Sequence, residues 1–207
     1  TLRHSSAASD VYKRQDKEAR KLIRQAKRIN PNSKVAVIGC YAQLNPDEIS
    51  NIKGVDLIIG SEKKFNLLNE LDNIDFSSET KVIRADISET HSFKPSYSIG
   101  DRTRSYLKIQ DGCDYVCSFC TIPLARGKSR NDSIKKTIQL ANQAIQEGAK
   151  ELVLTGVNIG DFGKSSNESF LSLIQELDKL DIERLRTSSV EPNLLSKEII
   201  NFCSSSK

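Results

Sequence analysis

The stretch SYLKIQDGCDYVCSFC, residues 105–120, joins a strand pattern to a loop that carries three of the chain's five cysteines. Residues 105–110 are typical of a short β-strand. Cys113, Cys117 and Cys120 come next, with three and then two residues between them. In a parallel α/β barrel the reactive groups lie on loops after the carboxyl ends of strands, and the cysteine loop has this position.

The sequence after this loop alternates between helix and strand patterns. We expect helices over 134–145, 170–177 and 194–202, and strands over 151–156 and 184–190. Asp132 or Ser133 is the expected N-cap of the first helix, and Gly148 comes after its end. With the strand at 105–110, these elements make three βα units, which match the opening of a parallel barrel. A closed barrel typically needs about 250 residues, so this one is expected to be partial.

A second α/β pattern precedes the cysteine loop. Apolar residues at helical spacing begin after Asp16, and short apolar runs at 34–39 and 55–60 are typical of buried parallel strands. A short helix is expected to open at Asn45-Pro46, and a longer one over 62–71. The predicted fold class is therefore α/β: an open α/β domain over 16–76, a linker over 77–100 with a possible edge strand at 81–85, and the partial barrel over 101–207.

The composition is that of a globular protein rather than a disordered one, with 37% apolar and 28% charged residues. No apolar run approaches the roughly 18 residues of a membrane span, and no secretory pattern opens the chain. We therefore expect a cytoplasmic protein, in which thiols stay reduced and clustered cysteines bind metal or react. The net charge of +4 permits an acidic partner such as RNA without requiring one.

The first fifteen residues, TLRHSSAASDVYKRQ, show neither helical nor strand periodicity. The chain contains no methionine, so it is not a whole open reading frame as written. We interpret residues 1–15 as an unstructured leader of foreign origin.

Three thiolates can hold three irons of a cubic iron–sulfur cluster and leave the fourth iron without a protein ligand. An open iron can take a substrate or cofactor, as open catalytic zinc sites do. The alternative is a zinc site completed by His91, Asp111 or Asp114. Neither histidine lies at the close spacing of zinc ligands, and carboxylates are less usual in structural zinc sites, so the spacing favours the cluster.

Further motifs surround these cysteines. Phe119 precedes the last cysteine, and the sequence runs on as FCTIPLARGKSR (119–130), then TGVNIGDFG (155–163) and SSVEP (188–192). Together they resemble the radical S-adenosylmethionine methylthiotransferase family, over about residues 16–207. The basic segment and the 155–163 motif look most like the branch that acts on threonylcarbamoyladenosine in tRNA.

The resemblance implies a four-iron cluster on Cys113, Cys117 and Cys120, whose open iron binds S-adenosylmethionine. Reductive cleavage, fed by an external electron donor, would release a 5′-deoxyadenosyl radical. Phe119 would lie near the adenine, or pack beneath the loop as a buried aromatic. Gly156 would let the backbone approach the methionine moiety, or simply end a strand. Glu191 is either a ligand contact or a surface glutamate.

Cys40 comes after the strand at 34–39, where open α/β sheets place their ligands, although taken alone it is typical of an inert buried cysteine. The resemblance makes it the third ligand of a second cluster. The other two ligands should lie upstream, where this chain has no cysteine. We therefore expect no second cluster and no turnover from this chain alone. Cys203 matches no motif and is interpreted as structural.

The family resemblance implies that the substrate is tRNA, with a methylthio group added to C2 of N6-threonylcarbamoyladenosine next to the anticodon. Arg126, Lys128 and Arg130 could contact RNA phosphates, or form a solvated basic loop. The alternative enzyme is a ribosomal-protein aspartate methylthiotransferase. The alternative from another class is a zinc-stabilised RNA-binding module that uses the same cysteines.

Overall fold

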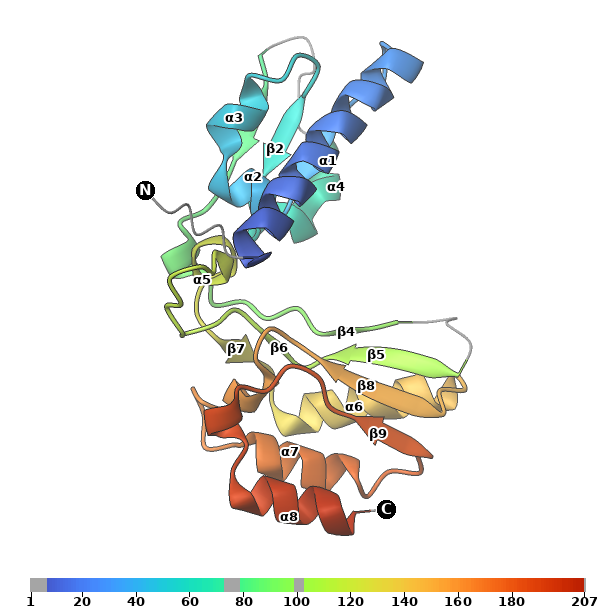
Figure 1. The fold of residues 1–207 in the computed structure, drawn as a ribbon. Coiled ribbons are helices and arrows are strands. Elements are labelled where there is room, and N and C mark those ends of the chain that lie inside the picture. The colour runs from blue at the N-terminus through green and yellow to red at the C-terminus, as the bar shows by residue number, and fades with distance from the viewer. Residues whose placement is uncertain (1–6, 73–78, 99–102, 207) are drawn as a thin grey trace. The chain divides into compact units, whose positions relative to one another are not determined.

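The computed structural model describes residues 7–72, 79–98 and 103–206, with side chains from residue 14 onward. The chain divides into two compact units (Figure 1). Unit 1 comprises residues 1–90 and 115–127, and unit 2 comprises residues 91–114 and 128–207. None of the helices in the described ranges combines the length and the apolar character needed to cross a bilayer.

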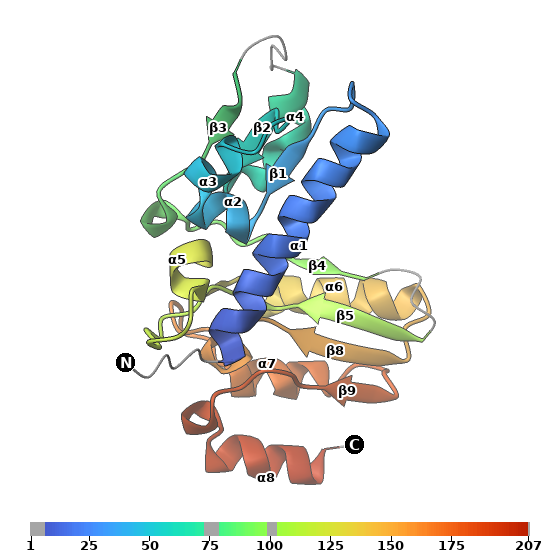
Figure 2. The same cartoon turned by 45° about the horizontal axis from the view of Figure 1, so that its top comes forward.

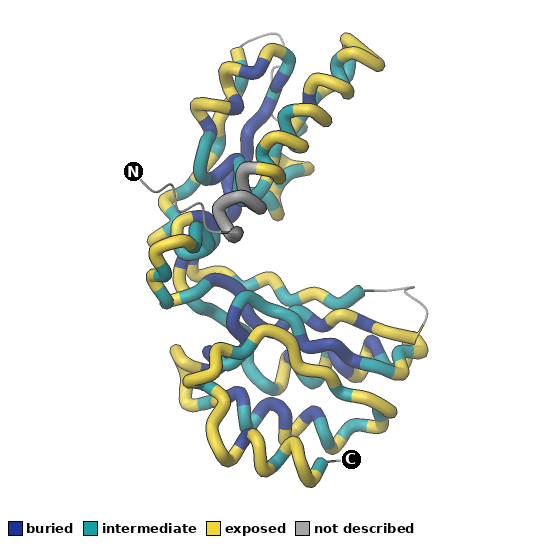
Figure 3. The backbone as a smooth tube through the Cα atoms, in the orientation of Figure 1, coloured by how far each residue is buried: buried dark blue, intermediate teal, exposed yellow. Residues whose placement is uncertain are grey.

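Unit 1 is built on a small parallel sheet. Its elements are α1 (Ala7–Ile29), β1 (Ala36–Ile38), α2 (Cys40–Leu44), α3 (Pro46–Ser50), β2 (Leu57–Ile59), the 3₁₀ turn η1 (Lys63–Asn66), α4 (Leu67–Asp72), β3 (Lys81–Ile83), η2 (Ile87–Glu89) and α5 (Ile122–Arg126). The strand order is β1-β2-β3, and both pairs are parallel. All three residues of the central strand β2 are buried (Figure 3). Figure 2 shows the three strands with the helices α1, α2, α3 and α4 around them. Ile23 of α1 and Ile49 of α3 share a buried cluster with Ile58, so apolar burial holds these helices to the sheet.

Unit 2 contains a larger sheet and its covering helices. Its elements are β4 (Ser96–Tyr97), β5 (Arg104–Lys108), β6 (Gln110–Asp111), β7 (Arg130–Asn131), α6 (Ile134–Gln146), β8 (Glu151–Thr155), η3 (Ile159–Asp161), α7 (Phe170–Leu177), β9 (Arg184–Arg186), η4 (Pro192–Leu194) and α8 (Lys197–Ser205). The strand order is β4-β5-β8-β9, in which β5, β8 and β9 are parallel and β4 is antiparallel to β5. A separate antiparallel pair joins β6 to β7.

One face of the unit 2 sheet carries the core. Leu107, Leu152 and Leu154 are buried in one cluster with Leu173 and Ile174 of α7. Because side chains alternate along a strand, Arg104 and Tyr106 of β5 lie on the opposite face and are exposed. The helical ends obey sequence rules. The Ser133 hydroxyl accepts from the Lys136 N–H as N-cap of α6, and Gly148 has a positive φ of 97° just after that helix.

The structure corrects several predicted boundaries. Residues 7–15 are not unstructured, because they form the first turns of α1. Ala, Lys, Arg and Gln are strong helix formers and no Gly or Pro interrupts them, so this segment continues the helix without an apolar stripe of its own. Residues 1–6 lie outside the described ranges. The strand predicted at 105–110 is broken into β5 and β6, and the strand predicted at 184–190 is limited to β9.

The two units also differ from the predicted domain limits. The strand predicted at 81–85 is β3, which belongs to the unit 1 sheet rather than to a linker. Residues 115–127 belong to unit 1, so the cysteine loop begins in unit 2 and ends in unit 1. The physical reason is local packing within unit 1, where α5, which comes after the cysteines, contacts α2.

Candidate functional site

The cysteine loop leaves unit 2 at the end of β6. Gly112 has a positive φ of 73°, which glycine adopts without strain, and the next residue is Cys113. Residues 112–120 form no helix or strand, and the Cys120 N–H donates to the Cys117 carbonyl at 3.0 Å to close a turn. All three cysteines are outside any disulfide in the described structure and are part-buried. Partly accessible thiols at this spacing have the donor chemistry of an iron–sulfur ligand set.

Gln110 fixes the base of this loop. Its side chain is fully buried, and its Nε2 donates to the carbonyls of Asp111 and Gly112 and to the Ser129 hydroxyl at 2.8–3.1 Å. Its Oε1 accepts from the backbone N–H groups of Val157 and Asn158 at 2.9 and 3.0 Å. One buried amide therefore joins the segment before Cys113 to the turn after β8.

Gly156 packs directly against this amide. A Cβ at Gly156 would lie 2.9 Å from the Gln110 Oε1 and 2.8 Å from the Ile159 Cγ2. A side chain here would displace the Gln110 amide and break its hydrogen bonds, which we call the Gln110 clamp. The close approach of Gln110 therefore requires glycine at position 156. Contact of Gly156 with a cofactor stays a prediction.

The two carboxylates beside the loop already have partners. Asp111 pairs with Lys108 at 2.8 Å and with Arg130 at 3.3 Å. Asp114 accepts from the Ser129 N–H at 2.9 Å and pairs with Lys164 at 3.0 Å. Burial alone would raise the pKa of Asp114, but the Ser129 N–H and the Lys164 ammonium lower it below its ordinary value. These contacts do not favour either carboxylate as a zinc ligand.

Three other predicted site residues are described. Phe119 is 54% exposed, so the interpretation of a buried aromatic beneath the loop is wrong. Glu191 is exposed and precedes η4, and its N–H donates to the Asn158 Oδ1 at 3.2 Å. His91 is exposed. Across the described ranges, no three His, Cys, Asp or Glu side chains are gathered as a metal site, so the three cysteines of the loop are not brought together as ligands. Only their residue type and spacing match a cluster, and their role as its ligands stays a prediction.

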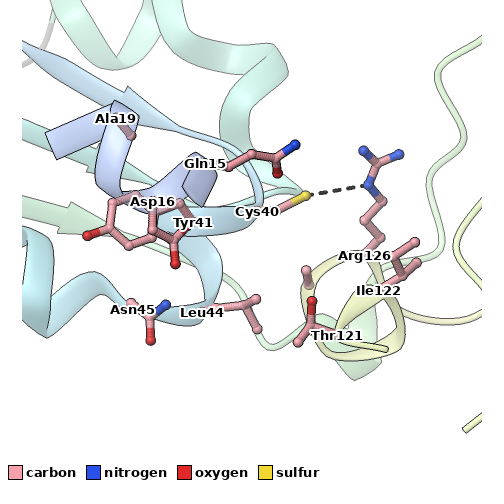
Figure 4. Close-up of a pocket in the computed structure, with 11 residues that line it drawn as sticks. Gln15, Asp16, Ala19, Cys40, Tyr41, Leu44, Asn45, Thr121, Ile122 and Arg126 are labelled. Carbon is pink, nitrogen blue, oxygen red and sulfur yellow. Dashed lines mark hydrogen bonds between the residues drawn. The ribbon is translucent and has the colours of Figure 1, made fainter. Parts of the chain in front are cut away.

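Cys40 lies in unit 1, just after the carboxyl end of β1, and is the first residue of α2 (Figure 4). Its Sγ accepts from the Arg126 Nε at 3.4 Å. Both residues line a cavity of about 580 Å³ in unit 1, together with Tyr41, Asn45 and Thr121. The Thr121 Oγ1 is buried and has no hydrogen-bond partner among the described residues. Cys40 is part-buried and contacts a cation, which differs from the inert buried cysteine considered from the sequence alone.

Side-chain hydrogen bonds are described for two of the three basic residues predicted near the cysteines. Arg126 donates to Cys40, and Arg130 donates to Asp111 and to the carbonyls of Ser92 and Lys128. Lys128 is exposed, and its charge helps to lower the pKa of Asp114. RNA contact by these three residues stays a prediction.

Sequence reasoning missed the buried polar residues that support the loop. Gln110, Asn158 and Asp161 are all buried, and Asn158 donates to the Asp161 Oδ2 at 3.3 Å. Burial, and after it repulsion from Asp114, raises the pKa of Asp161 above its ordinary value. A polar residue at the end of an apolar strand was the available signal for Gln110.

Comparison with known proteins agrees with the motifs. The model of the uncharacterized protein family UPF0004 matches residues 8–60. A threonylcarbamoyladenosine tRNA methylthiotransferase, MtaB, of Bacillus subtilis is 37% identical over 193 residues, which cover 89% of this chain and 42% of that protein. MtaB of Aquifex aeolicus is 37% identical, covering 90% of this chain and 46% of that protein. The tRNA-2-methylthio-N(6)-dimethylallyladenosine synthase of Ruegeria pomeroyi is 30% identical, covering 84% and 41%.

The resemblance to the methylthiotransferases is thereby confirmed, and the chain is a relative of that class. Among these relatives, the two threonylcarbamoyladenosine tRNA methylthiotransferases show the higher identity. The chain spans less than half the length of each of them.

Proposed function

We propose that this chain is part of a cytoplasmic radical S-adenosylmethionine methylthiotransferase that modifies C2 of N6-threonylcarbamoyladenosine in tRNA. The observation that carries the proposal is the three-cysteine loop, which follows the parallel strand β5 and the short strand β6. The relatives named for this activity support the choice of substrate. The alternatives, a ribosomal-protein methylthiotransferase and a zinc-stabilised RNA-binding module, have no specific observation in their favour.

The sheet of unit 2 supports this proposal through its topology. Strands β5, β8 and β9 are parallel, so the segments after them leave the same edge of the sheet. Those segments are β6 with the cysteine loop that follows it, the turn at Gly156, and the segment before Glu191. We interpret the sheet as the opening of a radical S-adenosylmethionine barrel.

Cys113, Cys117 and Cys120 would hold a four-iron cluster with one open iron. The bound cluster and S-adenosylmethionine supply one-electron chemistry for an unactivated aromatic C–H bond, with electrons from an external donor. The chain's own residues bind and orient. Gln110 and Gly156 fix the loop base, and the exposed ring of Phe119 is available to stack on a planar base.

Cys40 would belong to a second cluster, whose other ligands this chain does not contain. A single thiol cannot hold such a cluster, so we expect no methylthiolation by the purified 207-residue chain. Detectable turnover by that chain would contradict this part of the proposal.

The substrate is tested in cells that lack the gene. We expect 2-methylthio-N6-threonylcarbamoyladenosine to disappear from their tRNA, measured by nucleoside mass spectrometry. The intact gene and the gene with Cys203→Ala should restore it, because Cys203 is an exposed residue of α8 outside the site. The gene with Cys117→Ala should not. Unchanged tRNA nucleosides, with loss of a methylthio group from ribosomal-protein peptides, would favour the alternative enzyme.

A further inference from the structure

The longest helix of unit 1 carries two sets of cationic side chains with different surroundings. Arg20 donates to the Tyr41 hydroxyl at 3.1 Å and pairs with Glu48 at 2.6 Å. Lys27 donates to the Ser33 carbonyl and pairs with Asp56 at 3.2 Å. These two cations hold α1 against the rest of unit 1, so their positions are explained by the fold.

The second set has no such explanation. Lys17, Lys21, Arg24 and Arg28 are all exposed, and they are spaced four, three and four residues apart. At about 100° per residue, these positions fall on one narrow stripe of the helix, away from the buried Ile23. We call these four residues the basic stripe. Figure 3 shows exposed residues along this helix.

Within the described part of the chain, the basic stripe is almost uncompensated. Among the described residues, its one ion pair joins Lys21 to Glu18 at 3.5 Å, and both side chains are more than half exposed, so that pair is weak. Like charges three and four residues apart destabilise a helix. The stripe therefore opposes folding rather than supporting it, which favours a role in binding.

The dimensions of the stripe suit a nucleic-acid strand. From Lys17 to Arg28 the helix rises about 16 Å, which matches a run of several phosphates. Lys21, Arg24 and Arg28, with Gln25, also line a surface depression of about 330 Å³. Arginine and lysine side chains carry hydrogen-bond donors and no acceptor, which suits phosphate oxygens.

We propose that the basic stripe of α1 binds the phosphate backbone of folded RNA. This inference rests on the proposed function for the identity of the RNA, which would be tRNA. The stripe contacts phosphates and not bases, so it orients the RNA on unit 1 without reading sequence. Its contribution should therefore be equal for different tRNA sequences and should weaken with salt.

The test measures binding of the 207-residue chain to an unmodified tRNA transcript, by fluorescence anisotropy over a range of salt concentrations. Arg24→Gln/Arg28→Gln should weaken binding about tenfold and reduce the slope of log affinity against log salt by about two. Glutamine has a helix propensity close to that of arginine, so the helix should persist, as circular dichroism would verify. Lys17→Gln/Lys21→Gln gives an independent variant with the same expected direction.

The matched control is Lys136→Gln/Lys179→Gln, which removes the same charge from unit 2. Both lysines are exposed and pair with neighbouring carboxylates, Asp132 and Glu176. This control should change affinity less than about twofold. Equal affinity of the stripe variant and the control would overturn the inference and leave the proposed function standing. No tRNA binding by the wild type, or binding only to phosphatidylserine vesicles, would also overturn it.

Discussion

In each unit a strand is followed by a glycine and then by a cysteine, but the two places supply different numbers of thiols. In unit 1, β1 leads into Gly39, with φ of 98°, and then into Cys40. In unit 2, β6 leads into Gly112, with φ of 73°, and then into Cys113. In both places a glycine turns the chain so that a cysteine comes directly after the carboxyl end of a strand.

The residues after each cysteine make the difference. Cys40 enters α2 at once, so it contributes one thiol, which contacts Arg126. Cys113 enters a loop without helix or strand, which supplies Cys117 and Cys120. The loop is anchored at its base by Gln110, whereas Cys40 is anchored by its own helix. The comparison indicates that several thiols come from a segment without helix or strand whose first residues are held in place by Gln110, whereas a helix that begins at the cysteine contributes one.

The largest effect on stability should come from the base of the loop. Gln110→Ala removes the acceptor for two backbone N–H groups and the donor to two carbonyls, all in a buried place. Unpaired buried groups are costly, so we expect a loss of about 3 kcal/mol in the free energy of unfolding. Hydrogen exchange of peptides from β8 should report it.

The control for that variant is Gln143→Ala on the exposed face of α6, which should change stability by no more than about 0.5 kcal/mol. Faster exchange in β1 and β2 peptides than in β8 peptides after Gln110→Ala would contradict the assignment of Gln110 to unit 2.

The second comparison uses the glycine that ends a helix in each unit. Gly127, after α5, has φ of 77°, and an added Cβ would lie 2.8 Å from the Ile87 carbonyl oxygen. Gly148, after α6, has φ of 97° and open space around it. Gly127→Ala should therefore cost about 3 kcal/mol and Gly148→Ala about 1 kcal/mol, measured by urea unfolding. If the two substitutions reduced the free energy of unfolding equally, the positive φ alone would explain both losses, and the contact of Gly127 with Ile87 would contribute nothing.

Asp56 in unit 1 gives a smaller, pH-dependent effect. Its carboxylate accepts from the Val35 N–H at 2.8 Å and pairs with Lys27. Burial alone would raise the pKa of Asp56, but Val35 and Lys27 lower it below its ordinary value. Because the folded pKa is lower than the unfolded one, the stabilisation is complete above about pH 4 and is lost as pH falls through the folded pKa.

Asp56→Asn should therefore cost about 2 kcal/mol at neutral pH, and this difference should shrink below about pH 4. In unit 2 the pKa of Asp161 is shifted in the opposite direction from that of Asp56. Burial raises its pKa, so its charge opposes folding at neutral pH and this cost is relieved as pH falls through the folded pKa. A carboxyl NMR titration should find Asp161 above and Asp56 below the ordinary aspartate pKa. A pKa of Asp161 below that of Asp56 would contradict the environments described for both carboxyls.

The sequence predicted the parts of the fold that local patterns determine. The strands around 36–38 and 57–59, the helix of Ile134–Gln146 with its Ser133 cap, and the parallel order of unit 2 could be predicted from periodicity and turn residues. The helical state of residues 7–15 was missed, because helix propensity without an apolar stripe leaves no periodic signal.

The part of the candidate site that depends on residue type and spacing could be predicted from the sequence. The part that depends on tertiary contacts could not. Three cysteines in eight residues can be recognised from spacing. The clamp by Gln110 joins residues 47 positions apart, and the contact of Arg126 with Cys40 joins residues 86 positions apart. Neither pairing leaves a local pattern, since each depends on how the strands and helices pack.

The central claim is that the three-cysteine loop binds the metal of this chain, and that Cys40 does not. Iron, acid-labile sulfide and zinc should be measured per chain after anaerobic reconstitution of the wild type, Cys117→Ala and Cys40→Ala. We expect about four irons and four sulfides in the wild type and in Cys40→Ala, and almost none in Cys117→Ala. One tightly held zinc, or iron that is lost with Cys40 and kept without Cys117, would contradict the claim.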